Sequence, residues 1–351
     1  MNFKVLFLPF LTLTTLGVAP VAGTAFAQED ELVIVSTGGT LQDALETLFF
    51  EPFTSESDTR ITHVSAFTSE QFDTARTMKD SGDVEWDIVT AQPESFFHER
   101  DLLEELDCSR IPNAAEFGIE NTCATYGLLR TIGGGVIAYN TDAFPDEGPS
   151  SWVDFWDVER FPGQRCLPAI TPHWMIMIAL MADGADPDQL FPLDIDRGVS
   201  KLEELKPNVS GWWETGNESQ DMMRQGDCVM AWMWSGRALQ LMREGHPIAI
   251  SWNQHVPIVG YWAILKDAPN KDAAYDFLNF FMARPQAHRT FSETYFYDTA
   301  NRIATEQLSQ ENRKLRVTSP ENLAEQTPTD FHWIAEHQDE MRQAFDALLN
   351  K

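Results

Sequence analysis

Short apolar runs and helix-spaced apolar residues alternate along the first third of the chain. Leu32 to Val35 is a continuous apolar run of strand length, and after a turn at 36–40 the apolar residues from Leu41 to Phe49 recur at helical spacing. Two further runs of strand length, 61–67 and 86–89, are separated by a polar helical segment. Strands that alternate with helices in this way predict an α/β unit with a mainly parallel sheet.

The rest of the chain repeats this pattern after a long extended run. The run at 131–140 predicts a strand that crosses between two domains. The elements expected after it are a strand at 165–170, a helix at 175–181, strands at 228–234 and 256–265, a helix at 273–281 that ends before Pro285, and a helix at 334–349. A chain of 351 residues favours two compact units, because single cores stop growing near ~250–300 residues.

Two extended crossings, near Val136 and near Trp262, predict that the first domain is built from discontinuous sequence. A chain that leaves one domain and returns joins two lobes by a hinge, with a cleft between them. We expect lobe 1 to comprise residues 28–137 and 258–305, and lobe 2 to comprise residues 138–257 and 306–351. Each lobe is expected to hold a mainly parallel sheet flanked by helices.

The first residues predict export. Lys4 precedes an apolar stretch from Val5 to Leu16, and Ala25-Phe26-Ala27 follows with the small residues of a signal-peptidase site. Residues 1–27 are therefore expected to be a cleavable signal peptide, which implies a periplasmic protein without direct membrane insertion. The alternative is a transmembrane helix, which Pro9 and Pro20 disfavour.

Charge and cysteine content narrow the partners further. The net charge of −29 argues against nucleic acid or anionic lipid as a partner. Four cysteines in an exported chain suggest two disulfides, although three pairings are open. Cys108 and Cys123 would close a local loop, while Cys166 and Cys228 lie in apolar runs that would meet across one sheet. A metal site is the competing reading, but no C-x-x-C occurs, and we expect neither metal nor cofactor.

Catalytic motifs are absent from the sequence. It contains no G-x-S-x-G, Walker A or H-E-x-x-H motif, and the glycine run at 133–135 lacks the Lys-Ser/Thr of a phosphate-binding loop. We therefore expect a protein that is not an enzyme, with a secreted enzyme on the same fold as the alternative.

An ordered set of motifs resembles the periplasmic solute-binding proteins of ABC importers, in the branch that includes spermidine/putrescine-binding proteins. The motifs are Tyr139-Asn140-Thr141-Asp142, Ser151-Trp152, Phe155-Trp156, Trp212-Trp213, Gln225-Gly226-Asp227, Ala231 to Arg237, Trp252-Asn253-Gln254, Tyr261 to Ile264, Tyr297 to Asn301 and Ser319 to Leu323. The resemblance implies a type II periplasmic-binding fold that closes on a small-molecule ligand and delivers it to the membrane permease subunits. It implies a monomer, and a further role in feeding a chemoreceptor is compatible with it.

The resemblance also indicates where the ligand would bind. Trp234 and Tyr297 match family aromatics, but Gly260 stands where polyamine binders carry a ligand-binding aspartate. Thr171 and Trp174 stand where two more carboxylates are expected, and Thr37-Gly38-Gly39 replaces the aromatics of the first loop. The ligand is accordingly expected to be a polyamine-like amine from the resemblance, or alternatively an anionic or zwitterionic solute such as a phosphonate, a carboxylate or an amino-acid derivative.

The candidate contacts each have a competing structural explanation. Backbone N–H groups at 36–40 would bind an anion, or form only a helix cap. The aromatic candidates are Trp174, Trp213, Trp234, Trp262 and Tyr297, which are otherwise core residues. Gln92, Glu94 and Glu214 lie in expected cleft loops, where the two acids would replace the lost amine partners or remain solvated. Arg237 would bind a carboxylate or phosphonate through two of its guanidinium nitrogens, or lie solvated on the surface of the following helix.

Overall fold

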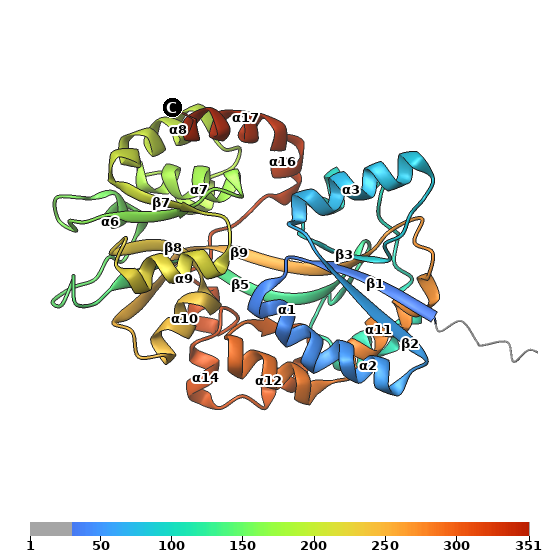
Figure 1. The fold of residues 1–351 in the computed structure, drawn as a ribbon. Helices are drawn as coiled ribbons and strands as arrows, with labels where there is room; N and C mark the ends of the chain where they lie inside the picture. The colour runs from blue at the N-terminus through green and yellow to red at the C-terminus, as the bar shows by residue number, and fades with distance from the viewer. Residues whose placement is uncertain (1–29, 351) are drawn as a thin grey trace, which may run out of the picture.

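The computed structural model describes residues 30–350, which form two lobes joined through one ten-stranded sheet (Figure 1). The strands are β1 (Asp30–Ser36), β2 (Thr59–Ser65), β3 (Ile88–Ala91), β4 (Cys123–Ala124), β5 (Gly127–Asn140), β6 (Arg165–Pro168), β7 (Val209–Trp213), β8 (Met230–Trp234), β9 (Ile248–Ile264) and β10 (Asp298–Thr299). Their order is β2-β1-β3-β9-β5-β8-β6-β7, with β4 and β10 paired to β5. The strands β1, β2 and β3 run parallel in one lobe and β6, β7 and β8 in the other, which confirms the α/β prediction.

Helices follow most strands and pack against both faces of the sheet (Figure 1). In the first half of the chain they are α1 (Gly39–Leu45), the π-helical turn η1 (Glu46–Phe50), α2 (Glu51–Glu56), α3 (Thr68–Ser81), α4 (Ser95–His98), η2 (Cys108–Arg110), α5 (Pro112–Phe117), α6 (Trp152–Trp156) and α7 (Pro172–Ala182). In the second half they are η3 (Pro187–Gln189), α8 (Ile195–Leu205), η4 (Lys206–Asn208), α9 (Gly216–Gln225), α10 (Ser235–Arg243), α11 (Lys271–Met282), α12 (Pro285–Tyr295), α13 (Arg302–Glu306), α14 (Gln310–Lys314), α15 (Pro320–Leu323), α16 (Phe331–Glu336) and α17 (Gln338–Leu349).

Two expected elements differ in detail. The helix expected at 334–349 is two helices, because at His337 the backbone leaves the helical region (φ −113°, ψ 14°). The His337 ring stacks on Trp333 with ring centres 4.0 Å apart, which fixes the break. The strand expected from Cys228 begins at Met230, so that Cys228 lies just before β8.

The buried apolar side chains form two separate clusters. One draws on residues 32–129 and 262–300, and the other on residues 136–256 and 334–348. The N-terminal part of the chain and the segment after β9 therefore share one core, as a discontinuous lobe requires. The expected lobe boundaries stay a prediction, and the predicted signal peptide at 1–27 lies outside the described residues. Within residues 30–350 no helix has both the length and the apolar character to cross a membrane.

The strands β5 and β9 connect the two lobes as one antiparallel pair. Their pairing runs from Leu128–Trp262 in one lobe to Asn140–Ile248 in the other, and Figure 1 shows both strands crossing the middle of the molecule. The residues 252–255 of β9 bulge opposite the single residue Val136. The lobes therefore meet at a bulged strand pair, where the locally disrupted ladder favours bending.

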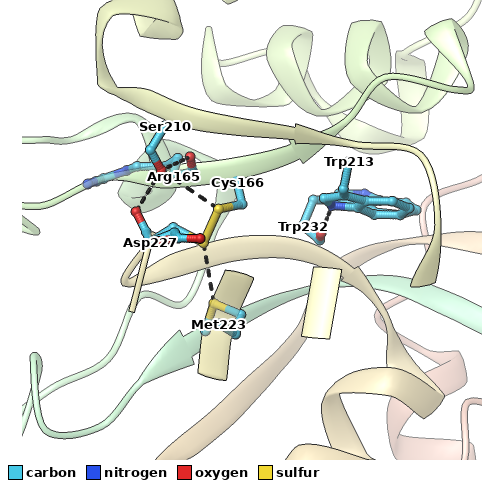
Figure 2. Close-up of a disulfide and its surroundings, with 8 residues drawn as sticks. Arg165, Cys166, Ser210, Trp213, Met223, Asp227 and Trp232 are labelled. Atoms are coloured by element: carbon cyan, nitrogen blue, oxygen red, sulfur yellow. Dashed lines mark hydrogen bonds between the residues drawn. A yellow bond between two sulfur atoms is a disulfide. The ribbon is translucent and has the colours of Figure 1, made fainter. Parts of the chain in front are cut away.

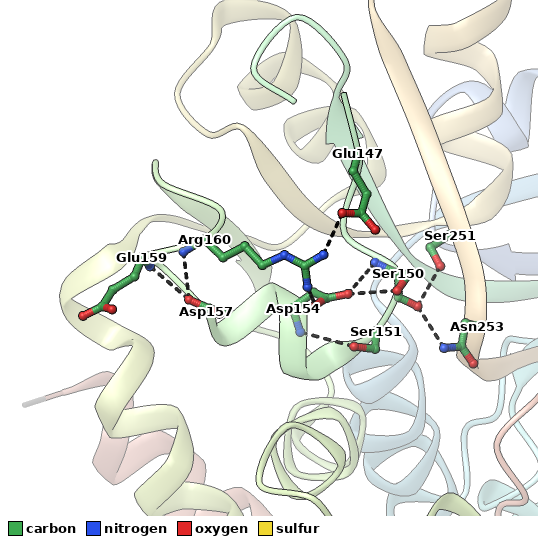
Figure 3. Close-up of polar contacts among 9 residues, drawn as sticks. All are labelled: Glu147, Ser150, Ser151, Asp154, Asp157, Glu159, Arg160, Ser251 and Asn253. Carbon is green, nitrogen blue, oxygen red and sulfur yellow. Dashed lines mark hydrogen bonds and ion pairs between the residues drawn. The ribbon is translucent and has the colours of Figure 1, made fainter. Parts of the chain in front are cut away.

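The loop before α6 is fixed to this bulge (Figure 3). Ser251 Oγ and Asn253 Nδ2 donate to the carbonyl of Ser150 at 3.2 and 2.9 Å. Asp154 Oδ2 accepts from the backbone and the hydroxyl of Ser150, and its Oδ1 pairs with Arg160 at 3.0 Å. Burial raises the pKa of Asp154, but these hydrogen bonds and the Arg160 charge outweigh burial and lower it. The hinge is thus anchored to lobe 2.

The glycine run at 133–135 is explained by close aromatic neighbours. A Cβ at Gly135 would lie 2.1 Å from Trp232 Cζ2, and one at Gly134 would lie 2.9 Å from His255 Nδ1. A Cβ at Gly133 would lie 3.1 Å from Tyr297. The run therefore allows large rings to pack against the hinge strand.

All four cysteines form disulfides, which confirms that expectation. Cys108 pairs with Cys123 and Cys166 with Cys228. Figure 2 shows the second bond linking β6 to the segment before β8, beside Ser210, whose hydroxyl donates to the Asp227 carbonyl at 2.6 Å. Each disulfide thus links elements of a single lobe: Cys108–Cys123 in lobe 1 and Cys166–Cys228 in lobe 2.

The two disulfides should differ in their contribution to stability. Their sequence separations are 62 residues for Cys166–Cys228 and 15 for Cys108–Cys123. From the lost entropy of the unfolded chain, we expect the double alanine variants to lower the free energy of unfolding by about 4 and about 3 kcal/mol respectively. Denaturant titration followed by tryptophan fluorescence measures both, and a larger loss for the shorter loop would contradict the expectation.

Candidate functional site

Arg130 is the extra residue of a second β-bulge, where β5 leaves lobe 1. Leu129 pairs with Tyr261 and Thr131 with Gly260, so Arg130 has no partner of its own on β9. A bulge of this kind re-aims the side chain of the extra residue. Gly260 provides the space, because a Cβ there would lie 3.0 Å from Arg130 Nη2.

The Arg130 guanidinium is enclosed by protein, and no acidic side chain in the described part of the chain pairs with it. The residue is 7% exposed, and its guanidinium carbon lies 4.7 Å from the centre of the Trp262 ring. Its Nε and Nη1 make no hydrogen bond within the described residues. Burial lowers the pKa of Arg130 to about 10, against a smaller opposing effect of Tyr297. Burying a cation without an anion beside it costs free energy, so this arrangement is suited to binding an anionic group of a ligand.

Tyr297 interacts with both Arg237 and Arg130. Burial raises the pKa of the Tyr297 phenol, while a hydrogen bond with Arg237 and the nearby charge of Arg130 lower it. Arg237 is buried on α10, and its Nη1 donates to Gln220 Oε1 at 3.3 Å. Two buried guanidinium groups therefore flank one phenol at the junction of the lobes, and we call Arg130, Tyr297 and Arg237 the junction cluster.

Two glycines make this close packing possible. A Cβ at Gly236 would lie 2.6 Å from Tyr297 Cζ, and one at Gly216 would lie 2.6 Å from Arg237 Nε and 3.0 Å from Trp234. The first turns of α9 and α10 can therefore lie close to the junction cluster, because glycine at positions 216 and 236 leaves room for its side chains.

A ladder of four indole rings leads from the core of lobe 2 to this cluster. Trp174 stacks on Trp232 with centres 4.9 Å apart, Trp232 lies 5.8 Å from Trp213, and Trp213 meets Trp234 edge to face at 5.4 Å. Trp174 and Trp213 are buried in the lobe 2 cluster and Trp262 in the lobe 1 cluster, whereas Trp234 is partly exposed. The Nε1 of Trp234 is enclosed and lacks a hydrogen bond. Trp234 is thus the member of the ladder placed to contact a ligand.

Glu94 follows β3, the strand beside β9. Its Oε2 is enclosed and has no hydrogen-bond partner among the described residues. Burial raises the pKa of Glu94 to about 7, with a weaker lowering effect from its own backbone N–H. Gln92 is half-buried in the same turn, where its N–H donates to Ser95 Oγ at 3.3 Å.

The other expected contacts lie around the same junction. The loop of Thr37, Gly38 and Gly39 follows β1, and a Cβ at Gly39 would lie 3.7 Å from Asn217 Nδ2 on α9, so this loop faces the second lobe. Thr171 is the half-buried residue that precedes α7. Glu214 is exposed after β7, and its N–H donates to Glu218 Oε2 at 2.7 Å. The ligand contacts of all these residues stay predictions.

An open pocket of about 680 Å³ lies elsewhere between the lobes. Pro93, Phe96 and Tyr261 line it on one side, and residues 187–191 and 328–332 on the other. Because neighbouring residues of a strand face opposite sides, Tyr261 points away from the side of Gly260, where Arg130 lies. Among residues 30–350 no His, Cys, Asp and Glu side chains gather into a group that could hold a metal ion.

Arg130 is the residue that the sequence analysis missed. Its signal is a single cation inside the apolar run Gly127-Leu128-Leu129-Arg130-Thr131-Ile132, where a strand between two neighbours is expected to be apolar. Arg237 was weighed as an anion ligand, and the structure buries it instead of leaving it on the surface.

Similarity to known proteins extends over most of the chain. A family model described as bacterial extracellular solute-binding protein matches residues 49–314. A gamma-aminobutyric acid-binding protein of Pseudomonas aeruginosa is 31% identical over 96% of both chains. A spermidine/putrescine-binding periplasmic protein of Haemophilus influenzae is 24% identical over 74% of both chains.

Solved structures show the same two-lobed architecture. An ABC transporter substrate-binding protein from Bradyrhizobium japonicum superposes with a TM-score of 0.82 at 31% identity, covering 91% of this chain and 99% of the other. The binding protein AgtB of A. tumefaciens R10, in complex with agropinic acid, superposes with a TM-score of 0.79 at 26% identity, covering 92% and 99%.

Proposed function

The chain belongs to the family of bacterial extracellular solute-binding proteins and is the substrate-binding component of an ABC importer, and from this premise we propose that its solute carries a carboxylate group. The observation that carries the proposal is the buried guanidinium of Arg130 at the junction of the lobes, whose Nε and Nη1 have no hydrogen-bond partner among the described residues. The solute would deliver to this guanidinium the anion that the protein does not provide.

Charge favours an acid over a polyamine at this place. A carboxylate fits a guanidinium through two parallel hydrogen bonds, which are stronger than bonds between neutral groups. An ammonium group beside Arg130 and Arg237 would meet two like charges, and like charges in contact cost several kcal/mol. The positions where polyamine binders are expected to carry carboxylates hold Thr171, Trp174 and Gly260.

The names of two relatives support the same choice. The Pseudomonas aeruginosa protein, 31% identical, binds γ-aminobutyric acid by its name, and the AgtB structure contains agropinic acid. The spermidine/putrescine-binding relative is more distant, at 24% identity. These ligands guide the choice of test compounds.

Capture would proceed by closure of the lobes on the solute. A solute that contacts both lobes stabilises the closed form by its differential affinity for that form. Closure on the solute is supported by the positions of three residues. Arg130 lies on β5, and Trp234 and Arg237 lie on the lobe 2 side of the hinge. The closed protein would then deliver the solute to the permease subunits, after export through the signal peptide at 1–27. The family consists of binding proteins, and we propose no catalytic role.

Titration calorimetry tests this function with four compounds: γ-aminobutyrate, agropinic acid, putrescine and spermidine. We expect at least one acid to bind, and both amines to bind about 100-fold more weakly or not at all, because of repulsion by the two guanidinium groups. Recovery of the bound acid unchanged separates binding from turnover. Tight binding of putrescine without binding of either acid would overturn the proposal in favour of a polyamine receptor.

A further inference from the structure

The open pocket between the lobes has one wall in each lobe, and we call it the reverse pocket. Its lobe 1 wall consists of Pro93, Phe96, Phe97, Ala124 and Tyr261. Its lobe 2 wall consists of residues 187–191 and 328–332. Tyr261 and Gly260 are neighbours on β9 and face opposite sides of the strand, so β9 separates this pocket from Arg130.

Both walls of the reverse pocket carry apolar rings that are open to solvent. In lobe 1 the ring of Phe96 packs edge to face on Tyr261, with centres 4.8 Å apart, and Phe97 is 47% exposed. In lobe 2 Phe191 is half-buried, and the ring of His332 meets Phe97 across the lobes with centres 5.0 Å apart. Each wall therefore leaves apolar surface in water that closer contact with the other wall would bury.

The structure described here is closer to a liganded relative than to an open one. The AgtB complex with agropinic acid superposes with a TM-score of 0.79 at 26% identity, covering 92% of this chain. The binding protein AttC of Agrobacterium tumefaciens C58, in an open unliganded conformation, superposes with a TM-score of 0.67 at 28% identity, also covering 92%. The enclosed junction cluster and the open reverse pocket therefore belong to an arrangement of the lobes that is close to a liganded one.

We propose that the reverse pocket narrows when the solute side opens, and that contact between its two walls stabilises the open, unliganded protein. The strands β5 and β9 connect the lobes, with the junction cluster on one side of β9 and the reverse pocket on the other. Bending of this strand pair that separates the lobes on one side therefore brings them together on the other. This role rests on closure of the lobes around the solute, as proposed above, and belongs to a surface that the solute does not touch.

Contact between the walls would set the affinity for the solute from a distance. The solute binds the closed form, so its apparent affinity is reduced in proportion to the fraction of empty protein that is closed. Burial of apolar surface favours the state in which that surface is buried. The reverse pocket should therefore lower affinity by stabilising the open form, and weakening the contact between its walls should tighten binding.

Opposite charges at position 97 test the direction of this effect. The facing wall carries Asp188 and Asp330. Phe97→Asp should repel these acids, disfavour the open form and bind γ-aminobutyrate about 2- to 5-fold more tightly than the parent protein. Phe97→Arg should attract them and bind about 2- to 5-fold more weakly. Calorimetry at low salt measures both, and equal affinities of the two variants would overturn the inference, since a merely structural role for Phe97 does not depend on the sign of the charge.

An uncharged variant tests the apolar part of the contact. Phe97→Ala removes the exposed ring, and we expect it to bind γ-aminobutyrate about 2- to 10-fold more tightly. Phe67→Ala is the matched control, because Phe67 is also an exposed phenylalanine of lobe 1, at 37%, but lies outside the residues that line the pocket. Its affinity should stay within about twofold of the parent. Weaker binding by Phe97→Ala would contradict a role in stabilising the open form.

Small-angle X-ray scattering tests the opening without a solute. We expect the empty parent protein to be more expanded than the structure in Figure 1, and the protein saturated with γ-aminobutyrate to match that structure. Empty Phe97→Asp should lie between the two. An empty parent protein whose scattering already matches the structure overturns the inference. Failure of every acid to bind refutes the proposed carboxylate site instead, and the scattering of the empty parent and variant still tests the reverse pocket.

Discussion

Replacing Arg130 by Met is expected to lower affinity for a carboxylate solute by at least about 100-fold while the protein stays folded. Removing one partner of a buried, hydrogen-bonded charge pair typically costs 2–5 kcal/mol or more in binding, and about 1.4 kcal/mol corresponds to tenfold in affinity. Met fills a similar volume against Trp262 and makes favourable contacts with an aromatic ring. Affinity is measured by calorimetry with γ-aminobutyrate.

The same substitution should leave the empty protein at least as stable as before. Among residues 30–350, Arg130 Nε and Nη1 have no hydrogen-bond partner, so the apolar variant loses no bond of these two atoms and removes a buried charge that has no acidic partner there. We therefore expect an unchanged or higher melting temperature without ligand. Arg130→Lys keeps the charge but loses the paired N–H groups, and should fall between the two in affinity.

Arg165 provides the matched control. It is fully buried in lobe 2, but its guanidinium donates to the carbonyl groups of Phe155, Phe161 and Gly163. Arg165→Met removes satisfied bonds, and we expect it to lower the melting temperature without weakening the affinity of the folded fraction. If Arg130→Met behaves like Arg165→Met, Arg130 is a structural residue and the carboxylate site is refuted.

The hydrophobic pattern predicted the strands well because their burial is regular. The runs at 32–35, 86–89 and 131–140 became β1, β3 and β5, with shifts of a few residues. The pattern also predicted that the chain returns to the first lobe, since β9 is a long apolar run. Sheet order was not predictable, because the pairing of β3 with β9 joins residues far apart in the sequence.

The site was predicted less well, because it depends on irregularities of the strand pair. A bulge at Arg130 breaks the two-residue alternation and cannot be seen in a hydrophobic pattern. The sequence showed that Gly260 stands where polyamine binders carry an aspartate. It did not show that the missing side chain leaves room for Arg130 from the neighbouring strand. Trp262 was expected either at the ligand or in the core, and the structure buries it in the lobe 1 core with its ring against Arg130.

Gly260→Asp is expected to abolish acid binding by supplying the missing partner from within the protein. The Cβ position at Gly260 lies 3.0 Å from Arg130 Nη2 and 2.9 Å from Thr131 Oγ1, both near the ends of side chains that can shift. Gly260 does not have a positive φ, so the backbone accepts a side chain. The new carboxylate would pair with Arg130, and affinity for γ-aminobutyrate should fall by about 100-fold or more, because the solute must now break an ion pair.

Two further variants separate charge from size at this position. Gly260→Asn introduces a side chain of the same shape without charge, and we expect it to retain most of the affinity that Gly260→Asp loses. In Gly260→Asp with Arg130→Met the carboxylate no longer has a guanidinium beside it, and this double variant should gain measurable affinity for putrescine, which the single variants lack. Equal losses in the Asp and Asn variants would show that crowding at residue 260, and not the charge of Arg130, governs binding, and would contradict the electrostatic basis of solute selection.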